Sequence, residues 1–408
     1  MKKNILAAGT AIVDITPPLE IGLLTSSVKG SFAPFNAIRL PLKARVLALQ
    51  SPDGVIVLVS LELLGLNDTV VGGWERFKKQ LSGDLPPERI IITCTHTHNA
   101  PESLAFSGLY RQEAFVQWLQ GLQRALKAAI KNALSELAPI SLDFGSTRLN
   151  GYSLLRRIPT AGGIVMSDSV QPVTPEWLAR EPVDRRVSIL RLRDASGAVL
   201  ATLVHAVCHP VNEMCLPHIS PDYPGELCLA LEVSGTYGMV MFLNGAAGNI
   251  NPLTVSEGPL AAHRHGKAIA GAVKNGYEVL AITSGLSFKS IWLSMPVRTG
   301  YMLDNPGDAV ARIAVLRLGS LAMIFLPGEP FVETALEIES SSPFPHTVVV
   351  GYAENSIGYI PTEEAMREGG YEAGPGKWSF LQQGADQIIL DETLHILHEL
   401  NTTEYETC

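Results

Sequence analysis

The residues best suited to chemistry lie at positions 93–101, which read Thr-Cys-Thr-His-Thr-His-Asn-Ala-Pro. His96 and His98 stand two positions apart, so both side chains point to one face if the chain stays extended. Two imidazoles on one face suit a metal ion, or one metal ligand with a helper. Two histidines are too few for a complete site, so a hydrogen-bonded loop with incidental histidines is the alternative.

The place of this segment in the chain favours the chemical interpretation. Residues 90–92 are three isoleucines, which predict a short strand buried on both faces. Polar residues begin directly after it, at the carboxyl end of the predicted strand. In open α/β sheets that end is where ligands bind.

Three further predicted strands end in polar loops. The strands predicted at 199–207, 239–243 and 321–326 lead, in that order, into His209, the loop 244–252 and Glu329. Four such strand ends indicate one pocket at a shared edge of the sheets. His96, His209 and Glu329 together offer two imidazoles and a carboxylate, a common catalytic zinc set that leaves one position open for water.

Alternatives remain for several of these residues. Glu329 precedes a helix predicted at 331–338, so it is either a ligand or a carboxylate that caps the helix. Ser220 and Asp222 precede Pro224, which suits the first turn of a helix, so both are also capping candidates. Glu62 lies in an apolar run and is either a satisfied structural group or part of a site.

Two loops offer groups that can bind substrate. Arg156 follows a strand predicted at 140–144 and precedes a Gly/Pro-rich stretch, where it can hold an anionic substrate group. The loop 244–252 is rich in small residues, which let a ligand approach the backbone. Its backbone amides are therefore candidates for an oxyanion hole.

The pattern of the whole chain predicts an α/β fold with mixed β-sheets flanked by helices. A strand ends at Asp14, and the other strands expected are 46–50, 55–63, 187–192 and 348–352. The helices expected are 68–81, 113–137, 261–279 and 385–400. His263 and His265, on the third of these helices, are expected at the surface.

Length, net charge, apolar runs and cysteine content limit the classes of protein to which this chain can belong. The chain has 408 residues without a linker or low-complexity segment, which predicts a single domain over residues 1–408. Its formal net charge of −9 argues against a nucleic-acid partner. No apolar run is long enough for stable insertion into a membrane, and the short apolar start is broken before it forms a signal peptide. Five cysteines without framework spacing fit reduced thiols, so we expect a cytoplasmic protein.

Two of those cysteines raise the question of soft metal ligation. Cys94 and Cys208 lie close to the key histidines, but the sequence has no CxxC pair. Both sit in apolar strands and are expected to be buried bystanders.

An ordered set of motifs resembles the amino-terminal catalytic domain of the neutral/alkaline ceramidase family. The matching segments run nearly from end to end: Ala8-Gly9 with 13–17, 95–98, 208–210, 219–225, 245–252, 327–329, and 358–362 with Tyr371-Glu372. Each motif is weak alone, and the ordered set is specific.

The resemblance implies a zinc site within a single ceramidase-like α/β domain. It assigns His96, His209 and Glu329 as ligands, with a tyrosine near the carboxyl end as the fourth. That tyrosine corresponds to Tyr359, or its true position is occupied by Ser356. His98 then assists next to the metal or binds substrate, and Arg156 matches a family arginine only loosely.

The chain also departs from the family pattern. Asn251 replaces the serine of the Gly-Asp-x-Ser-Pro loop, and Asn249 stands where the family has aspartate. Because an amide is not a nucleophile of that kind, zinc-bound water is the expected agent of attack. The secretion signal and the carboxyl-terminal β-sandwich of true ceramidases are not found in the sequence.

We therefore expect a zinc-dependent hydrolase, with one Zn²⁺ per chain, that cleaves an amide, ester or lactone of a small soluble substrate. The expected helpers are His98 for proton transfer, Tyr359 for charge stabilisation and Asp222 to orient a ligating histidine. The substrate would contact Arg156, Ser220 and Asn249, and Asn251 would hold the oxyanion. The alternatives are a metal-dependent isomerase or lyase acting on a sugar acid, and a non-catalytic ceramidase-like protein. A homo-oligomer is possible.

Overall fold

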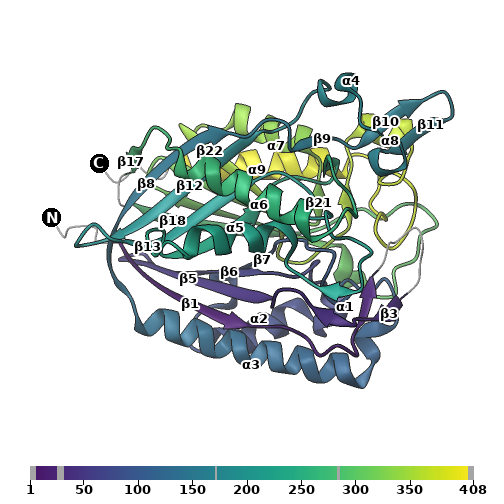
Figure 1. The fold of residues 1–408 in the computed structure, drawn as a ribbon. Helices are drawn as coiled ribbons and strands as arrows, with labels where there is room; N and C mark the ends of the chain where they lie inside the picture. The colour runs from purple at the N-terminus through teal and green to yellow at the C-terminus, as the bar shows by residue number, and fades with distance from the viewer. Residues whose placement is uncertain (1–5, 25–31, 171, 283–284, 403–408) are drawn as a thin grey trace.

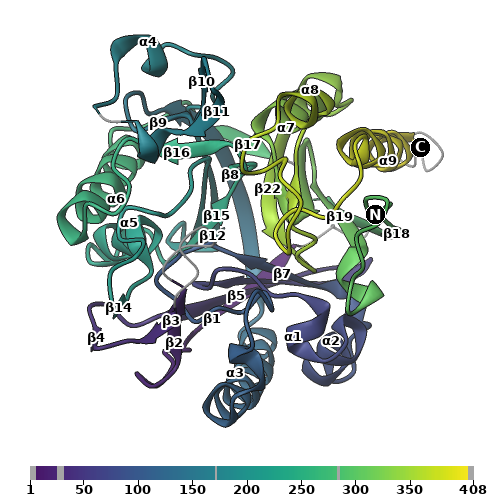
Figure 2. The same cartoon turned by 90° about the vertical axis from the view of Figure 1, so that its right-hand side faces the viewer.

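The computed structural model describes residues 6–24, 32–170, 172–282 and 285–402. Within these ranges one mixed sheet of thirteen strands forms the centre of the molecule (Figures 1 and 2). Across the sheet the order is β15 (Met239–Asn244), β13 (Val199–Ala206), β12 (Arg186–Asp194), β8 (Ala138–Arg148), β1 (Ala7–Asp14), β5 (Lys43–Ser51), β6 (Gly54–Leu61), β7 (Ile90–Cys94), β22 (His346–Ala353), β20 (Leu321–Pro327), β19 (Val310–Leu318) and β18 (Leu286–Ser294), with β17 (Leu280–Ile282) paired to β8.

The sheet is so strongly curved that β15 and β13, at one end of the pairing order, contact β6 and β22 further along it. The Ser60 hydroxyl of β6 donates to the Phe242 carbonyl of β15 over 2.9 Å, although five strands lie between β6 and β15 in the pairing order. The His205 ring of β13 lies 2.9 Å from the Val349 carbonyl of β22. Apolar side chains from nearly every strand fill the space enclosed by this curl.

Helices cover the outside of the curl in three groups (Figure 2). Each group packs its apolar stripe on neighbouring strands. The groups are α2 (Trp74–Ser82) with α3 (Glu113–Ser135) on β1, β5, β6 and β7; α5 (Asp222–Glu232) with α6 (Pro259–Lys274) on β12, β13 and β15; and α7 (Val332–Ser341) with α9 (Ala385–Thr402) on β19, β20 and β22. Gly9 lets α3 approach β1, because a Cβ there would lie 2.0 Å from the Ala133 carbonyl oxygen.

Short two-stranded ribbons and turns lie around the strand ends. The ribbons are β2 (Gly22–Leu24) with β3 (Phe32–Pro34), β4 (Ala37–Ile38) with β14 (His218–Ile219), β9 (Ser153–Leu155) with β16 (Ile250–Pro252), β10 (Arg157–Thr160) with β11 (Gly163–Met166), and β21 (Glu329–Pro330) with β23 (Tyr359–Ile360). The short helices are α1 (Asp68–Val71), α4 (Pro175–Leu178) and α8 (Glu363–Glu368), with 3-10 turns at Pro87–Arg89, Leu109–Arg111, Ser167–Ser169 and Pro306–Ala309.

The predicted class, mixed sheets flanked by helices, is confirmed, and the predicted strands lie in the central sheet. The helix predicted at 68–81 is helical but not continuous, because Gly72 and Gly73 adopt φ of 71° and 106° and separate α1 from α2. His265 is not at the surface: it is 4% exposed, and its ring stacks on Tyr223 at 4.1 Å. The hairpin of β18 and β19 was not predicted.

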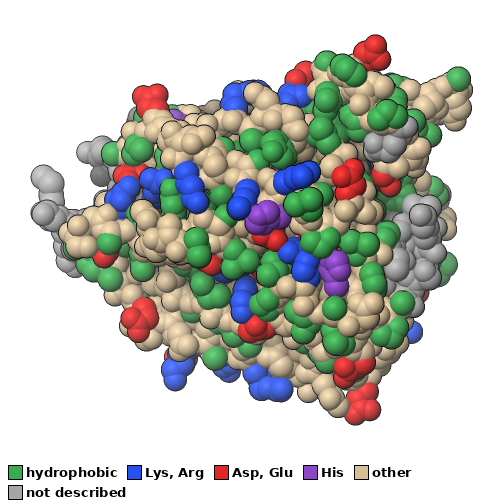
Figure 3. Space-filling view, in the orientation of Figure 1, with side chains coloured by type: hydrophobic (Ala, Val, Ile, Leu, Met, Phe, Trp, Pro, Cys, Tyr) green, Lys and Arg blue, Asp and Glu red, His purple; other side chains and the backbone are tan. Residues whose placement is uncertain are grey.

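The outer face that carries α5 and α6 shows Lys and Arg side chains interspersed with apolar and acidic ones (Figure 3).

None of the described helices is both long enough and apolar enough to cross a lipid bilayer.

Candidate metal centre

His96 lies just beyond β7, and the backbone turns sharply there. Its φ of 71° is in the left-handed region, which is uncommon for a residue with a Cβ and is frequent at functional sites. This turn therefore brings His96 and His98 together. The prediction from their spacing had instead assumed an extended chain. The Nδ1 atom of His96 lies 2.6 Å from the Leu64 carbonyl oxygen. Because a carbonyl only accepts, Nδ1 carries the proton and Nε2 presents its lone pair to the site.

His209 is oriented in the same way at the end of β13. Its Nδ1 lies 2.6 Å from the Ala247 carbonyl oxygen, so its Nε2 also faces the site. Gly248 brings the Ala247 loop close to Glu329, because a Cβ at Gly248 would lie 2.5 Å from the Glu329 carbonyl oxygen. Burial and the nearby Arg156 charge lower the pKa of His209 to about 4, so the imidazole is neutral at pH 7.

Glu329 completes a three-ligand arrangement. Its Oε2 lies 3.2 Å from Nε2 of His96 and 3.2 Å from Nε2 of His209. A carboxylate and two lone pairs therefore converge on one point in the interior.

These donor atoms fit a divalent metal. Nε2 of His96 and Oε2 of Glu329 are buried and have no hydrogen-bond partner among the described residues, which is costly unless another group satisfies them. Ligands about 2.0–2.1 Å from a tetrahedral zinc lie roughly 3.3 Å apart, close to the 3.2 Å that separates Oε2 of Glu329 from each Nε2 atom. The described residues thus fit the zinc site that the sequence implied.

His98 lies close enough to be a further ligand. Donor atoms of His96, His98 and His209 all lie within 4.8 Å of one another. Neither ring nitrogen of His98 has a hydrogen-bond partner in the described part of the chain. Burial, followed by the effects of His96 and His209, places the pKa of His98 well below its usual value. His98 can therefore bind the metal or exchange protons beside it.

Arg156 reaches the same centre from β9 and is held rigidly. Its Nε donates to Glu372 over 2.7 Å, and its Nη2 donates to the Tyr359 hydroxyl over 2.8 Å. Its Nη1 lies 3.2 Å from Nε2 of His209 and 3.4 Å from Oδ1 of Asn251. Four of the predicted site residues (Arg156, Asn251, Tyr359 and His98) thus line one cavity of about 70 Å³ together with His96, His209 and Glu329.

Three other predicted site residues lie elsewhere. Asn249 accepts from the Val332 amide and donates to Glu333, so it anchors the start of α7. The Ser220 hydroxyl lies between Arg39 and Glu213 and does not line the cavity. Neither residue is placed to contact a substrate in that cavity.

Asp222 does not orient a metal-ligating histidine. It is the first residue of α5, and its carboxylate accepts from the Asn212 side chain and from the amides of Glu213 and Tyr223. Backbone carbonyls orient His96 and His209 instead. Three of the backbone amides in the loop proposed for an oxyanion hole are also engaged: those of Gly245, Gly248 and Ile250 donate to Ala206, Pro330 and Ala247.

The structure adds two residues that sequence reasoning did not assign to the site. The Tyr352 ring stacks on His96 with centroids 4.1 Å apart, and its φ is 53°. Glu372 is buried and pairs with both Arg156 and Arg157. Tyr352 follows an apolar run like the other strand-end residues. The only indication of Glu372 in the sequence was that it belongs to Tyr371-Glu372, one of the motifs that resemble the ceramidase family.

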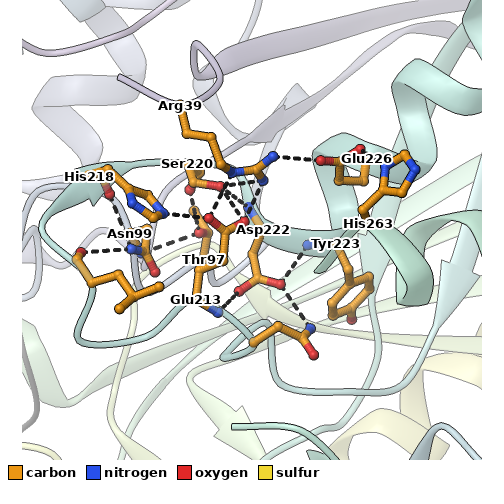
Figure 4. A network of polar contacts seen from close by, with 12 residues as sticks. Arg39, Thr97, Asn99, Glu213, His218, Ser220, Asp222, Tyr223, Glu226 and His263 are labelled. Carbon is orange, nitrogen blue, oxygen red and sulfur yellow. Dashed lines mark hydrogen bonds and ion pairs between the residues drawn. The ribbon is translucent and has the colours of Figure 1, made fainter. Parts of the chain in front are cut away.

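A buried polar network joins the two histidine-bearing loops (Figure 4). Glu213 lies on the loop after His209, is fully buried, and accepts from Arg39, His218 and Ser220. Ser220 in turn contacts the other loop: its carbonyl accepts from the Thr97 hydroxyl over 2.8 Å, and its amide donates to the Asn99 carbonyl over 3.0 Å. Glu213 thus fixes the His209 loop relative to the loop of His96 and His98.

Two of the solved structures that resemble this chain are ceramidases. The neutral ceramidase from Pseudomonas aeruginosa superposes with a TM-score of 0.75 and 18% identity, over 98% of this chain and 75% of that chain. A ceramidase in complex with C2 gives a TM-score of 0.78 and 16% identity, over 98% and 76%. The fold is that of a neutral ceramidase. No protein-family model and no curated protein matches the sequence.

The neutral-ceramidase fold agrees with the resemblance seen in the motifs. At 16–18% identity it establishes the architecture alone, so chemistry has to be argued from the centre around Glu329. The chain is thus a ceramidase-like α/β protein in which three converging imidazoles could hold a metal ion.

Proposed function

We propose that this protein is a zinc-dependent hydrolase that cleaves an amide bond of a small soluble substrate. The observation that carries the proposal is the convergence of His96, His209 and Glu329, whose donor atoms face one point. Nε2 of His96 and Oε2 of Glu329 have no hydrogen-bond partner among the described residues. Two imidazoles and a carboxylate are a common catalytic zinc set. A zinc ion held there would polarise a carbonyl and lower the pKa of bound water toward ~7.

The surrounding residues suit amide hydrolysis. His98 is neutral at pH 7, so a free ring nitrogen can accept a proton from water and return it to the leaving amine nitrogen. Arg156 presents Nη1 beside His209, where a fixed positive charge stabilises an oxyanion. Asn251 and Tyr359 hold that guanidinium in place and line the same cavity.

The fold supports an amide rather than an isomerase substrate. Both structural neighbours are ceramidases by name. Esters and lactones remain within the same proposal, because their carbonyl chemistry is similar.

Elemental analysis of purified protein tests the metal. We expect about one zinc per chain in the wild type and little in His96→Ala and His209→Ala. Each variant is checked for folding by circular dichroism. His263→Ala is the matched control, because His263 is a half-exposed histidine bonded to Glu226 outside the centre. A folded wild type that takes up no metal after zinc is offered would overturn the proposal.

Activity is tested on the zinc-loaded protein with p-nitroacetanilide and p-nitrophenyl acetate. We expect turnover that a chelator abolishes and that added zinc restores. Product masses separate hydrolysis, which gives two fragments, from isomerisation, which conserves mass.

A further inference from the structure

A second and larger cavity adjoins the candidate metal centre. Its volume is about 380 Å³, against about 70 Å³ for the cavity that holds the histidines. Glu329 and Phe106 line both cavities, so the two cavities are neighbours at these residues. The larger volume is within the range of pockets that bind small organic ligands, which begins near ~300 Å³.

The larger cavity is polar, and charged side chains of both signs line it besides Glu329. Arg111 and Lys377 line it together with Asp304 and Asp308. Two of these charges are already engaged: Asp308 accepts from the amide and hydroxyl of Thr69, and Lys377 donates to two backbone carbonyls of the 105–106 segment. Asp304 is exposed, and its carboxylate accepts no hydrogen bond from the residues described. Glu329 faces the metal centre, so Arg111 and Asp304 remain as one charge of each sign in this cavity, which favours an uncharged ligand.

Aromatic rings stand beside these polar groups. Tyr301 stacks on Phe380 with centroids 6.2 Å apart, and both line the cavity. A ring face next to a free carboxylate suits a compact polyol, which offers C–H groups to the ring and hydroxyl donors to the carboxylate. A long alkyl chain would leave Asp304 and its neighbours without the hydrogen bonds they make in water.

The smaller cavity differs from the larger one in having several apolar side chains around the metal centre. Apart from the residues of the metal centre, Leu64, Met166 and Met214 are among the side chains that line it. Its volume lies far below that of a pocket for a large ligand. It therefore suits a short apolar group next to the reacting carbonyl.

We propose that the substrate is a short-chain N-acylated amino sugar or similar amino polyol. Its uncharged, hydroxyl-rich amine half occupies the larger cavity, and its acyl group occupies the smaller one. The inference rests on the proposed function for its chemistry. In the reaction the amide C–N bond breaks and a water oxygen bonds to the carbonyl carbon. The nitrogen gains a proton, which leaves a short carboxylic acid and the free amino polyol.

Binding is measured first, because it does not depend on turnover. The probes are N-acetylglucosamine, N-acetylgalactosamine and N-acetylmannosamine, with N-acetylbenzylamine and N-acetylglucosamine 6-phosphate as comparators. Saturation-transfer NMR should detect at least one neutral hexosamine more strongly than either comparator. Asp304→Ala and Tyr301→Ala should weaken its Kd at least fivefold. Asp84→Ala removes an exposed aspartate that does not line the cavity and should leave the Kd unchanged.

Hydrolysis by the zinc-loaded protein is measured second. The kcat/KM for the bound N-acetylhexosamine should exceed that for its N-palmitoyl analogue at least tenfold. Asp304→Ala should lower kcat/KM for the hexosamine at least fivefold more than for p-nitroacetanilide, mainly through KM.

The outcomes separate this inference from the proposed function. If p-nitroacetanilide is cleaved but no neutral hexosamine binds, the substrate class is wrong and the hydrolase proposal stands. If a hexosamine binds in the larger cavity but no amide is cleaved, the hydrolase proposal fails and the assignment of the cavity as a polyol site stands. Equal losses in Asp84→Ala and Asp304→Ala would also overturn the cavity assignment.

Discussion

At the scale of single residues, the centre depends on charges that are buried but paired. Arg156 and Arg157 are 2% and 5% exposed, and both bond to the fully buried Glu372. Removing one partner from such a cluster leaves a charge without compensation in a medium of low dielectric constant. Glu372 is therefore as important to the shape of the centre as a ligand would be, although it touches no candidate ligand.

Replacing Glu372 by glutamine should destabilise the protein by about 3–5 kcal/mol, because two buried guanidinium groups lose their shared carboxylate. Urea unfolding at equilibrium measures this change. Glu368→Gln is the matched control: Glu368 also pairs with Arg157, but its side chain is 45% exposed, and the expected loss is under ~1 kcal/mol. Equal losses in the two variants would mean that burial does not decide the contribution of these pairs.

At the scale of elements, the loops after β7 and β13 carry the histidines, and the network of Figure 4 holds these loops together. The left-handed turn at His96 is strained for a residue with a Cβ, so surrounding contacts have to maintain it. Glu213 is the central acceptor of those contacts. Burial opposes its charge, but His218 and Arg39 hold the pKa of Glu213 below its usual value.

Glu213→Gln should weaken zinc binding about tenfold, because residues that position metal ligands from a distance typically contribute 10–100-fold to affinity. A competition titration with a chromogenic chelator measures the Kd. Glu226→Gln is the control, since Glu226 also binds Arg39 but contacts His263 and not the ligand loops. A structural role alone would lower stability in Glu213→Gln and leave the zinc Kd unchanged.

Asp222 makes the same network sensitive to pH. Burial, and then the Glu213 charge, raise the pKa of Asp222 to about 6 from the model-peptide value of 3.8. Between those values the folded state holds a proton that the unfolded state has lost, so this contribution to stability is present below pH ~4 and lost as the pH rises through ~6. The free energy of unfolding of the wild type relative to Asp222→Asn should fall by up to about 3 kcal/mol between pH 4 and pH 6. A flat difference in urea titrations across that range would contradict it.

The helices and strands could be predicted from the sequence more accurately than the contacts between them. Apolar runs located β7, β13, β15 and β20, because a buried strand is a local pattern. The residues at their ends could be named for the same reason. Ser220 and Asp222 were misplaced because their polar partners, Arg39 and Asn212, come from segments whose contacts are set by the tertiary fold. Gly72 and Gly73 are a local sign of a helix break, which the prediction of one helix over 68–81 did not take into account.

At the scale of the whole molecule, the curl of the sheet brings the ligands together. His96, His209 and Glu329 are separated by more than a hundred residues each along the chain and follow three different strands. The Asn244 side chain joins two of these strand ends: it donates to the Thr95 carbonyl, and its oxygen accepts from the Cys208 amide. A metal bound at the centre would therefore link distant parts of the chain in the folded state only.

Zinc should accordingly stabilise the whole molecule by mass action. At a free zinc concentration of 100 times the Kd, the free energy of unfolding should rise by about 2.7 kcal/mol, because the unfolded chain does not bring the three ligands together. The measurement is equilibrium unfolding in urea with chelated and with buffered free zinc. His209→Ala should show little of this gain, and His263→Ala should show all of it. A gain that persists in a variant lacking both His209 and His98 would place the stabilising metal elsewhere on the protein, since the remaining His96 and Glu329 form too few ligands for a closed zinc site.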